Sequence, residues 1–377
     1  MKKTALIALI ILISLLLCGR AFAAPDISAR SAILCLPDGR VLYENNADAR
    51  MLIASTTKIM TALVVLENCD PGEVVKVSAK STAVEGSSMY LRPGEELTVE
   101  ELLYGMMLCS GNDAAHALAL HTAGSIEAFA ELMNRKAAEL GLTNSSFKNP
   151  HGLDEEGHYS SAADLAKIAA AAMEHELFRE IVATKHKLVA GRSLVNHNKL
   201  LWSCEGVMGI KTGYTKAAGR TLVSCAQRDG LTLICVTLCA PDDWDDHMKL
   251  YDWAFSQYRM HAVSEKGREF IRLPVVTGVA DTVGVCYGED FSLLLNKEDE
   301  LEVKVRLPKF VYAPVWESDV AGTIELSVNG EFVKSIPLVY AESVELDEEA
   351  KLDFWGRIKR WWNLGSMQGL RLGLLPM

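Results

Sequence analysis

The sequence predicts an α+β fold, in which helices flank an antiparallel five-stranded sheet, followed by a smaller all-β domain and an amphipathic C-terminal helix. Three observations support this expectation. Strand patterns near both ends of the first 260 residues enclose a middle section with helical periodicity. Period-two alternation dominates after Arg268. The C-terminal tail carries tryptophans and cations at helical spacing.

Residues 1–23 have the pattern of an export signal. Two lysines precede an uncharged apolar stretch from Ala5 to Leu17, and Ala21-Phe22-Ala23 provides a small-residue cleavage site. An uncleaved anchor is the alternative, but the stretch is shorter than the ~20 residues that span a bilayer. We therefore expect cleavage after Ala23 and export of the chain to the outer face of the cytoplasmic membrane.

Charge and cysteine spacing exclude several classes of protein. The formal net charge is -11, and removal of the signal makes it more negative, so nucleic acid is not an expected partner. The nine cysteines show no paired Cys-x-x-Cys arrangement, so neither a metal ribbon nor any other metal or cofactor is expected. Most lie in apolar runs, which favours free buried thiols and leaves disulfides open.

The first domain, residues 24–260, should open with a hairpin. Its strands, Ala32–Leu36 and Val41–Glu44, flank the turn residues Pro37-Asp38-Gly39-Arg40. Three later strands should complete a sheet of about five. These strands are Val207–Thr215, Thr221–Gln227 and Leu231–Leu238.

Helical patterns fill the middle of this domain. Thr98 and Glu101 form a capping-box pattern that opens a helix ending near Ser110. Other expected helices are Asp113–Ala123, Ser125–Leu140, Ala162–His175 and, after the last strand, Asp243–Gln257. The last of these helices should pack back on the sheet.

Residues 261–345 should form the small β-rich domain. Leu301–Leu307 alternates with period two, and Thr323–Val328 meets Glu331–Leu338 across an Asn-Gly turn. No cluster of candidate catalytic residues occurs here. A spacer or a partner surface is therefore the expected role.

Residues 346–377 combine an acidic linker with an amphipathic helix. Tryptophans and other apolar residues fall on one face and cations on the other, which suits a helix lying on an anionic membrane surface. The alternative is a helix docked on the protein itself. The apolar face comprises Phe354, Trp355, Ile358, Trp361 and Trp362, and the cations are Arg357, Lys359 and Arg360.

A Ser-x-x-Lys pattern occurs twice, at Ser55-Lys58 and at Ser145-Lys148. Ser55 opens an apolar run at helical spacing that continues without glycine or proline until Pro71. Ser145 lies among turn residues and is expected in a loop. At a helix start, residues three apart share a face, and the positive end of the helix favours an alkoxide and a neutral lysine. We therefore expect Ser55 to be the nucleophile.

Lys58 can activate Ser55 only in its neutral form. An ordinary lysine, with a pKa near ~10.4, is almost fully protonated at pH 7, so burial and nearby cations must lower the pKa of Lys58. Lys211 is the expected neighbouring cation. We predict that Lys58 is the base and that Lys211 keeps its charge.

Two further strings supply the other candidate site residues. Ser110 can pass a proton to a departing amine, and Asn112 can hold Lys58 or a substrate amide; an ordinary interhelical turn is the alternative. On an expected strand, Lys211 with Thr212 or Thr215 can bind a terminal carboxylate, and Gly213 lets a ligand backbone approach. The amides of Ser55 and Tyr214 are candidates for an oxyanion hole.

The ordered trio of Ser-x-x-Lys, Ser-Gly-Asn and Lys-Thr-Gly resembles the pattern of penicillin-binding proteins and class A β-lactamases. The fuller strings are similar to those of serine D-alanyl-D-alanine carboxypeptidases, the low-molecular-mass penicillin-binding proteins, over nearly the whole chain. These strings are Ala54–Thr61, Asn149–Leu153, His158–Ser160 and Gly209–Thr215.

The resemblance implies a penicillin-binding and β-lactamase-like transpeptidase fold and a reaction. Ser55 would attack a peptidoglycan stem pentapeptide, release the terminal D-alanine and form an acyl-enzyme that water hydrolyses. Penicillins would acylate the same serine. Two departures concern substrate preference: Ala240–Trp244 lacks the arginine that assists carboxylate binding in some relatives, and Arg220 stands where smaller or uncharged residues are familiar.

Three alternative functions fit the sequence less well. A β-lactamase would resemble class A enzymes in a Glu-x-x-x-Asn string before the lysine strand, which is not found between Ala162 and Lys211, and it would carry Ser-Asp-Asn instead of Ser-Gly-Asn. A zinc peptidase would need a His-Glu-x-x-His helix, which the histidines do not form. His151 instead suits a supporting role in a loop. A penicillin-sensing, wall-binding module without turnover is disfavoured by the intact Ser55, Lys58 and Lys211.

Overall fold

The computed structural model describes residues 24–347, so the predicted signal peptide and most of the predicted C-terminal anchor lie outside the described residues. The chain divides after Gln257 into two compact units. None of the helices within residues 24–347 has both the length and the apolar character that a membrane crossing requires.

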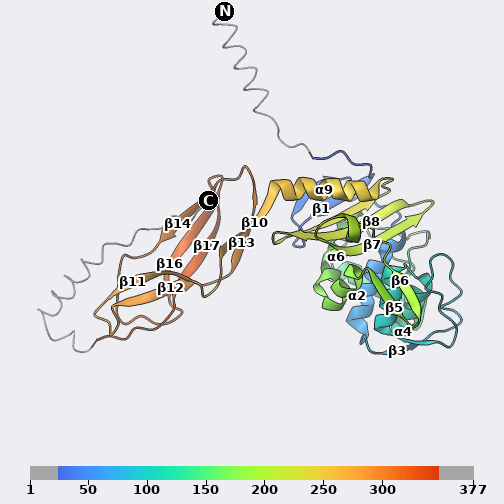
Figure 1. Ribbon diagram of the computed structural model, residues 1–377, viewed down its shortest axis with the longest axis horizontal. Coiled ribbons are helices and arrows are strands. Elements are labelled where there is room, and N and C mark those ends of the chain that lie inside the picture. Colours follow the sequence, from blue (N-terminus) through green and yellow to red (C-terminus); the bar gives the residue numbers. More distant parts are fainter. Residues whose placement is uncertain (1–23, 348–377) are drawn as a thin grey trace, which may run out of the picture. The chain divides into compact units, whose positions relative to one another are not determined.

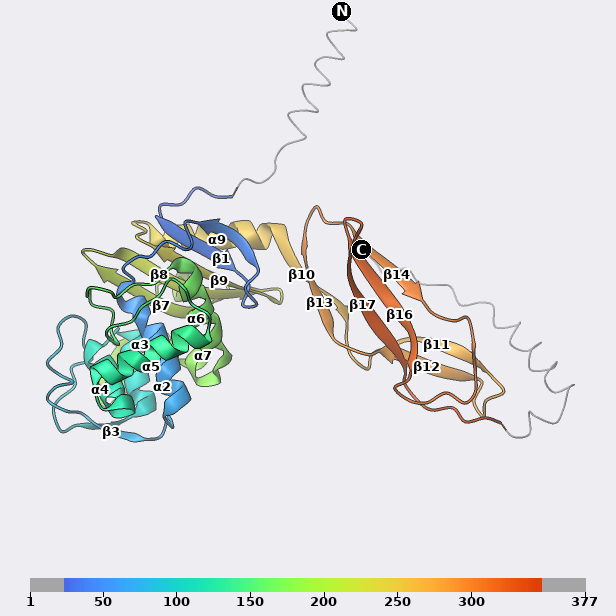
Figure 2. The same ribbon diagram turned by 180° about the vertical axis from the view of Figure 1, so that it is seen from behind.

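The predicted antiparallel five-stranded sheet is confirmed, in the order β2-β1-β9-β8-β7. The interior strands carry long runs of buried residues because helices cover both faces. Helix α9 (Asp243–Gln257) lies on one face and α6 (Ala162–Glu174) on the other (Figures 1 and 2). The strands are β1 (Ser31–Cys35), β2 (Val41–Asn45), β7 (Val207–Thr215), β8 (Gly219–Arg228) and β9 (Leu231–Leu238).

The middle of the chain forms the predicted helical layer around a buried helix. Residues 58–65 of α2 (Lys58–Asn68) are all buried, since this helix contacts α3, α4, α5 and α6. The predicted capping box at Thr98 and Glu101 is present at the start of α3. The other helices are α3 (Val99–Leu108), α4 (Asn112–Ala123), α5 (Ile126–Glu139), α7 (Glu176–Ala183) and the short α8 (Leu200–Ser203).

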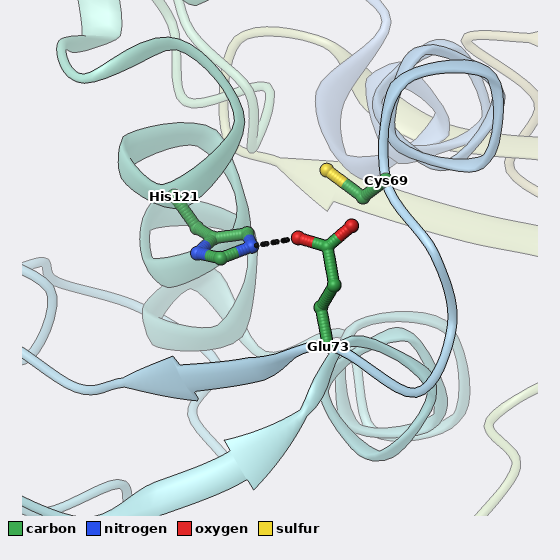
Figure 3. A group of neighbouring side chains, drawn as sticks. All are labelled: Cys69, Glu73 and His121. Carbon is green, nitrogen blue, oxygen red and sulfur yellow. Dashed lines mark hydrogen bonds and ion pairs between the residues drawn. The ribbon is translucent and has the colours of Figure 1, made fainter.

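The N-terminal ends of helices α2 and α4 lie close together, and so do their C-terminal ends. Lys58 and Asn112 are the first residues of the two helices. At the opposite ends, Cys69 follows α2 and His121 lies in the last turn of α4, with Glu73 between them (Figure 3). The two helices therefore connect two clusters of polar side chains.

Two short two-stranded sheets of the first unit were not predicted. Strand β3 (Val74–Lys76) pairs with β4 (Glu96–Thr98), and β5 (His186–Val189) pairs with β6 (Arg192–Val195). Each strand has only three or four residues, and most of them are exposed or half-buried. They therefore lack the apolar alternation that indicates a strand in a sequence.

The second unit is the predicted all-β domain. Its larger sheet has the order β14-β16-β17-β12-β11-β15, and the predicted Asn-Gly hairpin is β16 with β17. Alternate residues such as Ile324, Leu326, Ile336 and Leu338 form its core. The strands are β10 (Tyr258–Ser264), β11 (Glu269–Val276), β12 (Thr282–Tyr287), β13 (Phe291–Asn296), β14 (Leu301–Arg306), β15 (Val311–Tyr312), β16 (Val320–Val328) and β17 (Glu331–Tyr340).

Candidate active site

Ser55 lies in a single 3-10 turn, η1 (Ala54–Thr57), that leads into α2, and not in the α-helix itself as the sequence suggested. Ala54 begins the turn with a φ of 46°, and the hydroxyl of Thr56 donates to the carbonyl of Ile53 at 2.6 Å. In a 3-10 turn, residues three apart are eclipsed. This places Lys58 directly beside Ser55.

The amine of Lys58 is fully buried and contacts three oxygen atoms. Its Nζ lies 2.9 Å from the Ser55 Oγ, 2.7 Å from the Asn112 Oδ1 and 2.8 Å from the carbonyl oxygen of His151. Burial, and secondarily the positive charge of Lys211, lowers the pKa of Lys58 well below its ordinary value. The carbonyl of His151 is a partner that the sequence did not indicate.

Ser110 and Asn112 flank Gly111 at the start of α4. Ser110 has a φ of 62° and is only 5% exposed, so an unusual backbone conformation directs its side chain. No residue in the described range 24–347 makes a hydrogen bond with its hydroxyl, which leaves that group available. Asn112 uses its oxygen for Lys58 and its nitrogen for the carbonyl of Glu85 at 2.7 Å. It therefore holds the lysine and an adjacent loop together.

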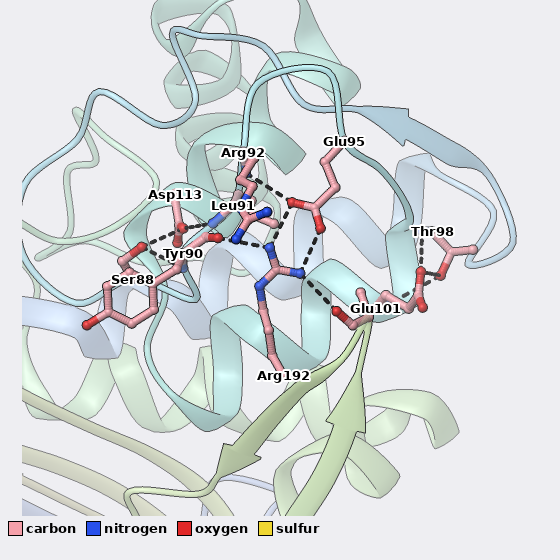
Figure 4. Close-up of polar contacts among 10 residues, drawn as sticks. Ser88, Tyr90, Leu91, Arg92, Glu95, Thr98, Glu101, Asp113 and Arg192 are labelled. Atoms are coloured by element: carbon pink, nitrogen blue, oxygen red, sulfur yellow. Dashed lines mark hydrogen bonds and ion pairs between the residues drawn. The ribbon is translucent and has the colours of Figure 1, made fainter.

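This loop is fixed by two charged residues (Figure 4). The carboxylate of Asp113 accepts hydrogen bonds from the Ser88 hydroxyl at 2.6 Å and from the amides of Met89 and Leu91 at 3.0 Å. Arg192 makes a bidentate ion pair with Glu95, at 2.7 and 2.8 Å, and also donates to the carbonyl of Tyr90.

Neither charged residue was singled out in the sequence. Asp113 follows Asn112 directly, and its position one residue into a helix start was the available signal, because carboxylates there accept backbone amides. The partner of Arg192 lies 97 residues away, so no local pattern indicates it.

Strand β7 brings the Lys-Thr-Gly string alongside the Ser55 turn. Lys211 is buried, its amine donates to the carbonyl of Thr212 at 2.9 Å, and burial lowers its pKa to about 7. A Cβ atom at Gly213 would lie 2.9 Å from the amide nitrogen of Ser55 and would also collide with the hydroxyl of Thr221. Glycine is thus required here so that the strand can approach the Ser55 turn.

The last two predicted residues of this strand differ in exposure and contacts. Tyr214 is 66% exposed, at the end of β7 opposite Arg220. The hydroxyl of Thr215 donates to Asp154 at 3.0 Å and accepts from the amide of Ala218. Thr215 therefore joins the strand to the loop that follows Gly152.

The loop Asn149–Leu153 packs against the other side of the Ser55 turn. Asn149 accepts the amide of Gly152 at 2.8 Å. Gly152 has a φ of +86° and directly contacts the backbone of Ala54. These contacts place the carbonyl of His151 on Lys58. His151 therefore has the predicted supporting position, with a pKa lowered to about 3, mainly by burial.

His158 contacts the Ser55 turn through Thr57. Its Nδ1 accepts the amide of Lys148 at 3.1 Å, so the proton of a neutral ring is on Nε2, which donates to the Thr57 hydroxyl at 2.8 Å. Burial lowers its pKa to about 4, which keeps the ring neutral at pH 7. No individual role was predicted for this residue from the sequence.

The second Ser-x-x-Lys string has a different environment. Ser145 lies in a loop, and its hydroxyl contacts the carboxylate of Asp164 and the hydroxyl of Ser160, both at 2.8 Å. The side chain of Lys148 is exposed. This serine therefore has structural partners in place of a buried lysine.

Arg220 is fixed by the segment that lacks the familiar arginine. Its guanidinium donates to the buried carboxylate of Asp243 at 2.9 Å and stacks over the ring of Trp244. Asp243 begins α9. The two departures from the family pattern, Arg220 and the segment Ala240–Trp244, are thus joined by one ion pair.

Together, the α+β fold and the serine hydroxyl beside a buried lysine amine define a serine hydrolase of the penicillin-binding class. Family models agree: residues 19–242 match the D-alanyl-D-alanine carboxypeptidase model, and residues 258–346 match the C-terminal domain of penicillin-binding protein 5. The chain belongs to this D-alanyl-D-alanine carboxypeptidase family.

Individual relatives extend over both units. D-alanyl-D-alanine carboxypeptidase DacF of Bacillus subtilis is 37% identical, covering 84% of this chain and 86% of the relative. DacC of Escherichia coli is 35% identical, covering 89% and 88%. Among solved structures, penicillin-binding protein 5 of Haemophilus influenzae has a TM-score of 0.66 at 30% identity, covering 85% of this chain and 98% of that chain.

Proposed function

We propose that this protein is a serine D-alanyl-D-alanine carboxypeptidase that removes the terminal D-alanine from peptidoglycan stem pentapeptides through an acyl-enzyme on Ser55. Penicillins acylate the same serine. The family assignment supports this reaction. The single observation that carries the mechanism is the contact set of Lys58, whose amine meets two fixed acceptors and the Ser55 hydroxyl.

The number of hydrogens on the amine explains why this contact set suits a base. A neutral lysine amine has two hydrogens and one lone pair, whereas the ammonium has three hydrogens and cannot accept. Asn112 and the His151 carbonyl can take the two hydrogens. The lone pair then points to Ser55 and can accept its hydroxyl proton. As the Ser55 oxygen bonds to the substrate carbonyl carbon, that proton passes to Lys58.

The remaining predicted residues supply the other parts of the reaction. The amide nitrogens of Ser55 and Tyr214 are the proposed oxyanion donors, and loss of one such donor typically costs about 2.7 to 4 kcal/mol of activation free energy. Lys211 with Thr212 or Thr215 binds the terminal carboxylate. The hydroxyl of Ser110 delivers a proton to the departing D-alanine amine as the amide bond breaks, and it receives in return the proton that Lys58 took from Ser55. Water then attacks the acyl-enzyme: its hydroxide bonds to the acyl carbon, its proton passes through Lys58 to the Ser55 oxygen, and the shortened peptide leaves.

The purified mature chain tests the reaction directly. It should release one D-alanine from a stem pentapeptide and none from the tetrapeptide product, with the same yield in a metal chelator. Benzylpenicillin should form a long-lived adduct. Rapid turnover of benzylpenicillin without D-alanine release would indicate a β-lactamase, and an adduct without D-alanine release would indicate a penicillin-sensing module.

The charge of Lys211 provides a pH-dependent prediction. A positive neighbour lowers the pKa of a lysine, so Lys211→Gln should raise the pKa of Lys58. Because the base is active above its pKa, the acid limb of penicillin acylation should move to higher pH. This change in the pKa of Lys58 should be largest at pH values below the Lys211 pKa of about 7, where Lys211 is charged.

Rates of acylation measured from pH 5 to pH 10, each normalised to its own plateau, check this expectation. Lys216→Gln is the matched control, because Lys216 is exposed just after the same strand. An acid limb that stays in place or moves to lower pH in Lys211→Gln would show that Lys211 does not act on Lys58 through its charge.

The location of the enzyme is also a proposal. We infer that residues 1–23 direct export and that the C-terminal tail attaches the chain to the outer face of the cytoplasmic membrane, because the tail combines tryptophans with cations. This location would place the site beside newly inserted wall peptides.

Vesicle binding tests the attachment. The mature chain should sediment with anionic vesicles and much less with neutral ones. A double variant, Trp361→Ala with Trp362→Ala, should lose most of this binding. Trp202→Ala is the control, since Trp202 is a 52%-exposed tryptophan of the first unit. Equal sedimentation of both variants would indicate that the tail docks on the protein instead.

A further inference from the structure

A second cluster of reactive side chains lies outside the candidate active site. One ligand-type atom each from Cys69, Glu73 and His121 lies within 4.8 Å of the other two. The imidazole Nε2 of His121 contacts the Glu73 carboxylate at 2.9 Å, and the Cys69 side chain lies next to the same carboxylate (Figure 3). Nothing in the proposed reaction uses these residues.

The backbone orients all three side chains toward one point. Cys69 caps the end of α2, and a tight turn with a hydrogen bond from the Asp70 amide to the second Glu73 oxygen holds that carboxylate in place. His121 lies in the last turn of α4, and the neighbouring Thr122 hydroxyl contacts the Cys69 sulfur at 3.3 Å. The cluster is therefore built by three separate elements, α2, α4 and the turn before β3.

Electrostatics at this point favour a cation. The C-terminal end of a helix carries partial negative charge, and the cluster lies at the C-terminal ends of both α2 and α4. The Glu73 carboxylate adds a full negative charge. The Cys69 side chain is half-buried, whereas Glu73 and His121 are more exposed, so an ion can enter from solvent.

The ligand types select the ion. Thiolate with imidazole and carboxylate suits Zn²⁺, whereas Mg²⁺ and Ca²⁺ prefer oxygen ligands alone. Thiolate and carboxylate together neutralise the two charges of the ion. Ligand atoms around tetrahedral zinc lie roughly 3.3 to 3.6 Å apart. The pair at 2.9 Å therefore has to open by about half an ångström, a movement that exposed side chains allow.

We propose that Cys69, Glu73 and His121 bind one Zn²⁺ ion, with water as the fourth ligand. Binding displaces the thiol proton of Cys69 to solvent, because the thiolate is the ligand. The ion joins the far ends of the two helices whose first residues are Lys58 and Asn112. Helix α2 has 11 residues, or roughly 16 Å, so the ion lies far from the Ser55 turn.

The sequence did not indicate this site, and the expectation of no metal was based on the lack of paired Cys-x-x-Cys spacing and of a His-Glu-x-x-His helix. Cys69 and Glu73 are four residues apart, but His121 follows 48 residues later. Only the packing of α4 against the end of α2 brings the third ligand to the other two.

Metal titration of the whole mature chain tests the proposal. After removal of metals with EDTA, the protein should bind one Zn²⁺ in competition with a chromophoric chelator. Co²⁺ should give a thiolate-to-cobalt absorption band in the near ultraviolet together with visible bands of tetrahedral intensity. Saturating Zn²⁺ should raise Tm, because a ligand that binds only the folded chain stabilises it.

Variants distinguish this cluster from other binding. Cys69→Ser should eliminate the cobalt-thiolate band, and His121→Ala should weaken Zn²⁺ binding by at least about tenfold, the lower end of the effect of disturbing a metal site. Cys204→Ser is the control, since Cys204 is another half-buried free thiol of the same unit. Mg²⁺ and Ca²⁺ should not compete.

Two results would overturn the proposal. The first is no Zn²⁺ binding to the metal-free protein at micromolar concentrations. The second is binding that is unchanged in Cys69→Ser and His121→Ala, which would place the ion elsewhere. Release of D-alanine should continue in EDTA, so failure of the metal site and failure of the proposed carboxypeptidase reaction give separate readouts.

Discussion

Ser55→Ala should abolish both penicillin acylation and D-alanine release, whereas Ser145→Ala should leave both unchanged. The two serines share the Ser-x-x-Lys pattern, but only the Ser55 hydroxyl lies beside a buried lysine amine, at 2.9 Å. Removing the nucleophile of a serine hydrolase lowers turnover by roughly 10⁶-fold. Ser145 has a hydrogen bond to Asp164 to lose, so its variant should change stability and not chemistry.

Mass spectrometry of the penicillin adduct and a D-alanine assay measure these effects. The adduct should lie in the peptide that contains residue 55 and should be absent from the Ser55→Ala protein. Thermal unfolding of both variants serves as the control for folding. An adduct elsewhere in the chain, or D-alanine release by a folded Ser55→Ala variant, would remove the basis of the proposed mechanism.

The sequence was sufficient to predict the main sheet because its strands are long and apolar. Strands β8 and β9 are buried over most of their length, β7 is buried at its centre, and the hairpin β1-β2 has clear turn residues. Helix α9 was predicted at its observed bounds, because four acidic residues and the preceding proline mark its start. The sequence signals for such elements lie within the elements themselves.

The site was only partly predictable, since its contacts join distant parts of the chain. The Ser-x-x-Lys spacing indicated that Lys58 is near Ser55, but the two acceptors that fix the Lys58 amine come from residues 54 and 93 positions away. The expected reason for Gly213, approach of a ligand, was incomplete. The structure adds a second reason, the close passage of β7 along the amide of Ser55.

The loop around Gly152 shows how a residue without a reactive group can control the site. Gly152 has a φ of +86°, which disfavours any residue with a Cβ atom. A Cβ atom there would overlap the carbonyl group of Ala54 and would lie 2.7 Å from the Thr57 hydroxyl. The adjacent carbonyl of His151 is a partner of Lys58. A side chain at Gly152 would therefore displace both the Ser55 turn and the His151 carbonyl that contacts Lys58.

Gly152→Ala should consequently cause a large loss of both stability and activity. The positive φ costs about 1 to 2 kcal/mol of unfolding free energy, and overpacking adds about 1 to 3 kcal/mol. A displacement of about 1 Å at a catalytic group can lower the rate about 10²-fold. Urea unfolding and the rate of penicillin acylation measure the two losses.

Gly141→Ala separates the two causes. Gly141 also has a positive φ, of +65°, but a Cβ atom there meets nothing within 4 Å. This variant should show the backbone cost alone, with acylation at the normal rate. Equal stability and equal activity of Gly152→Ala and Gly141→Ala would show that the contact of Gly152 with the Ser55 turn contributes nothing to either property. The position of the His151 carbonyl beside Lys58 would then need another explanation.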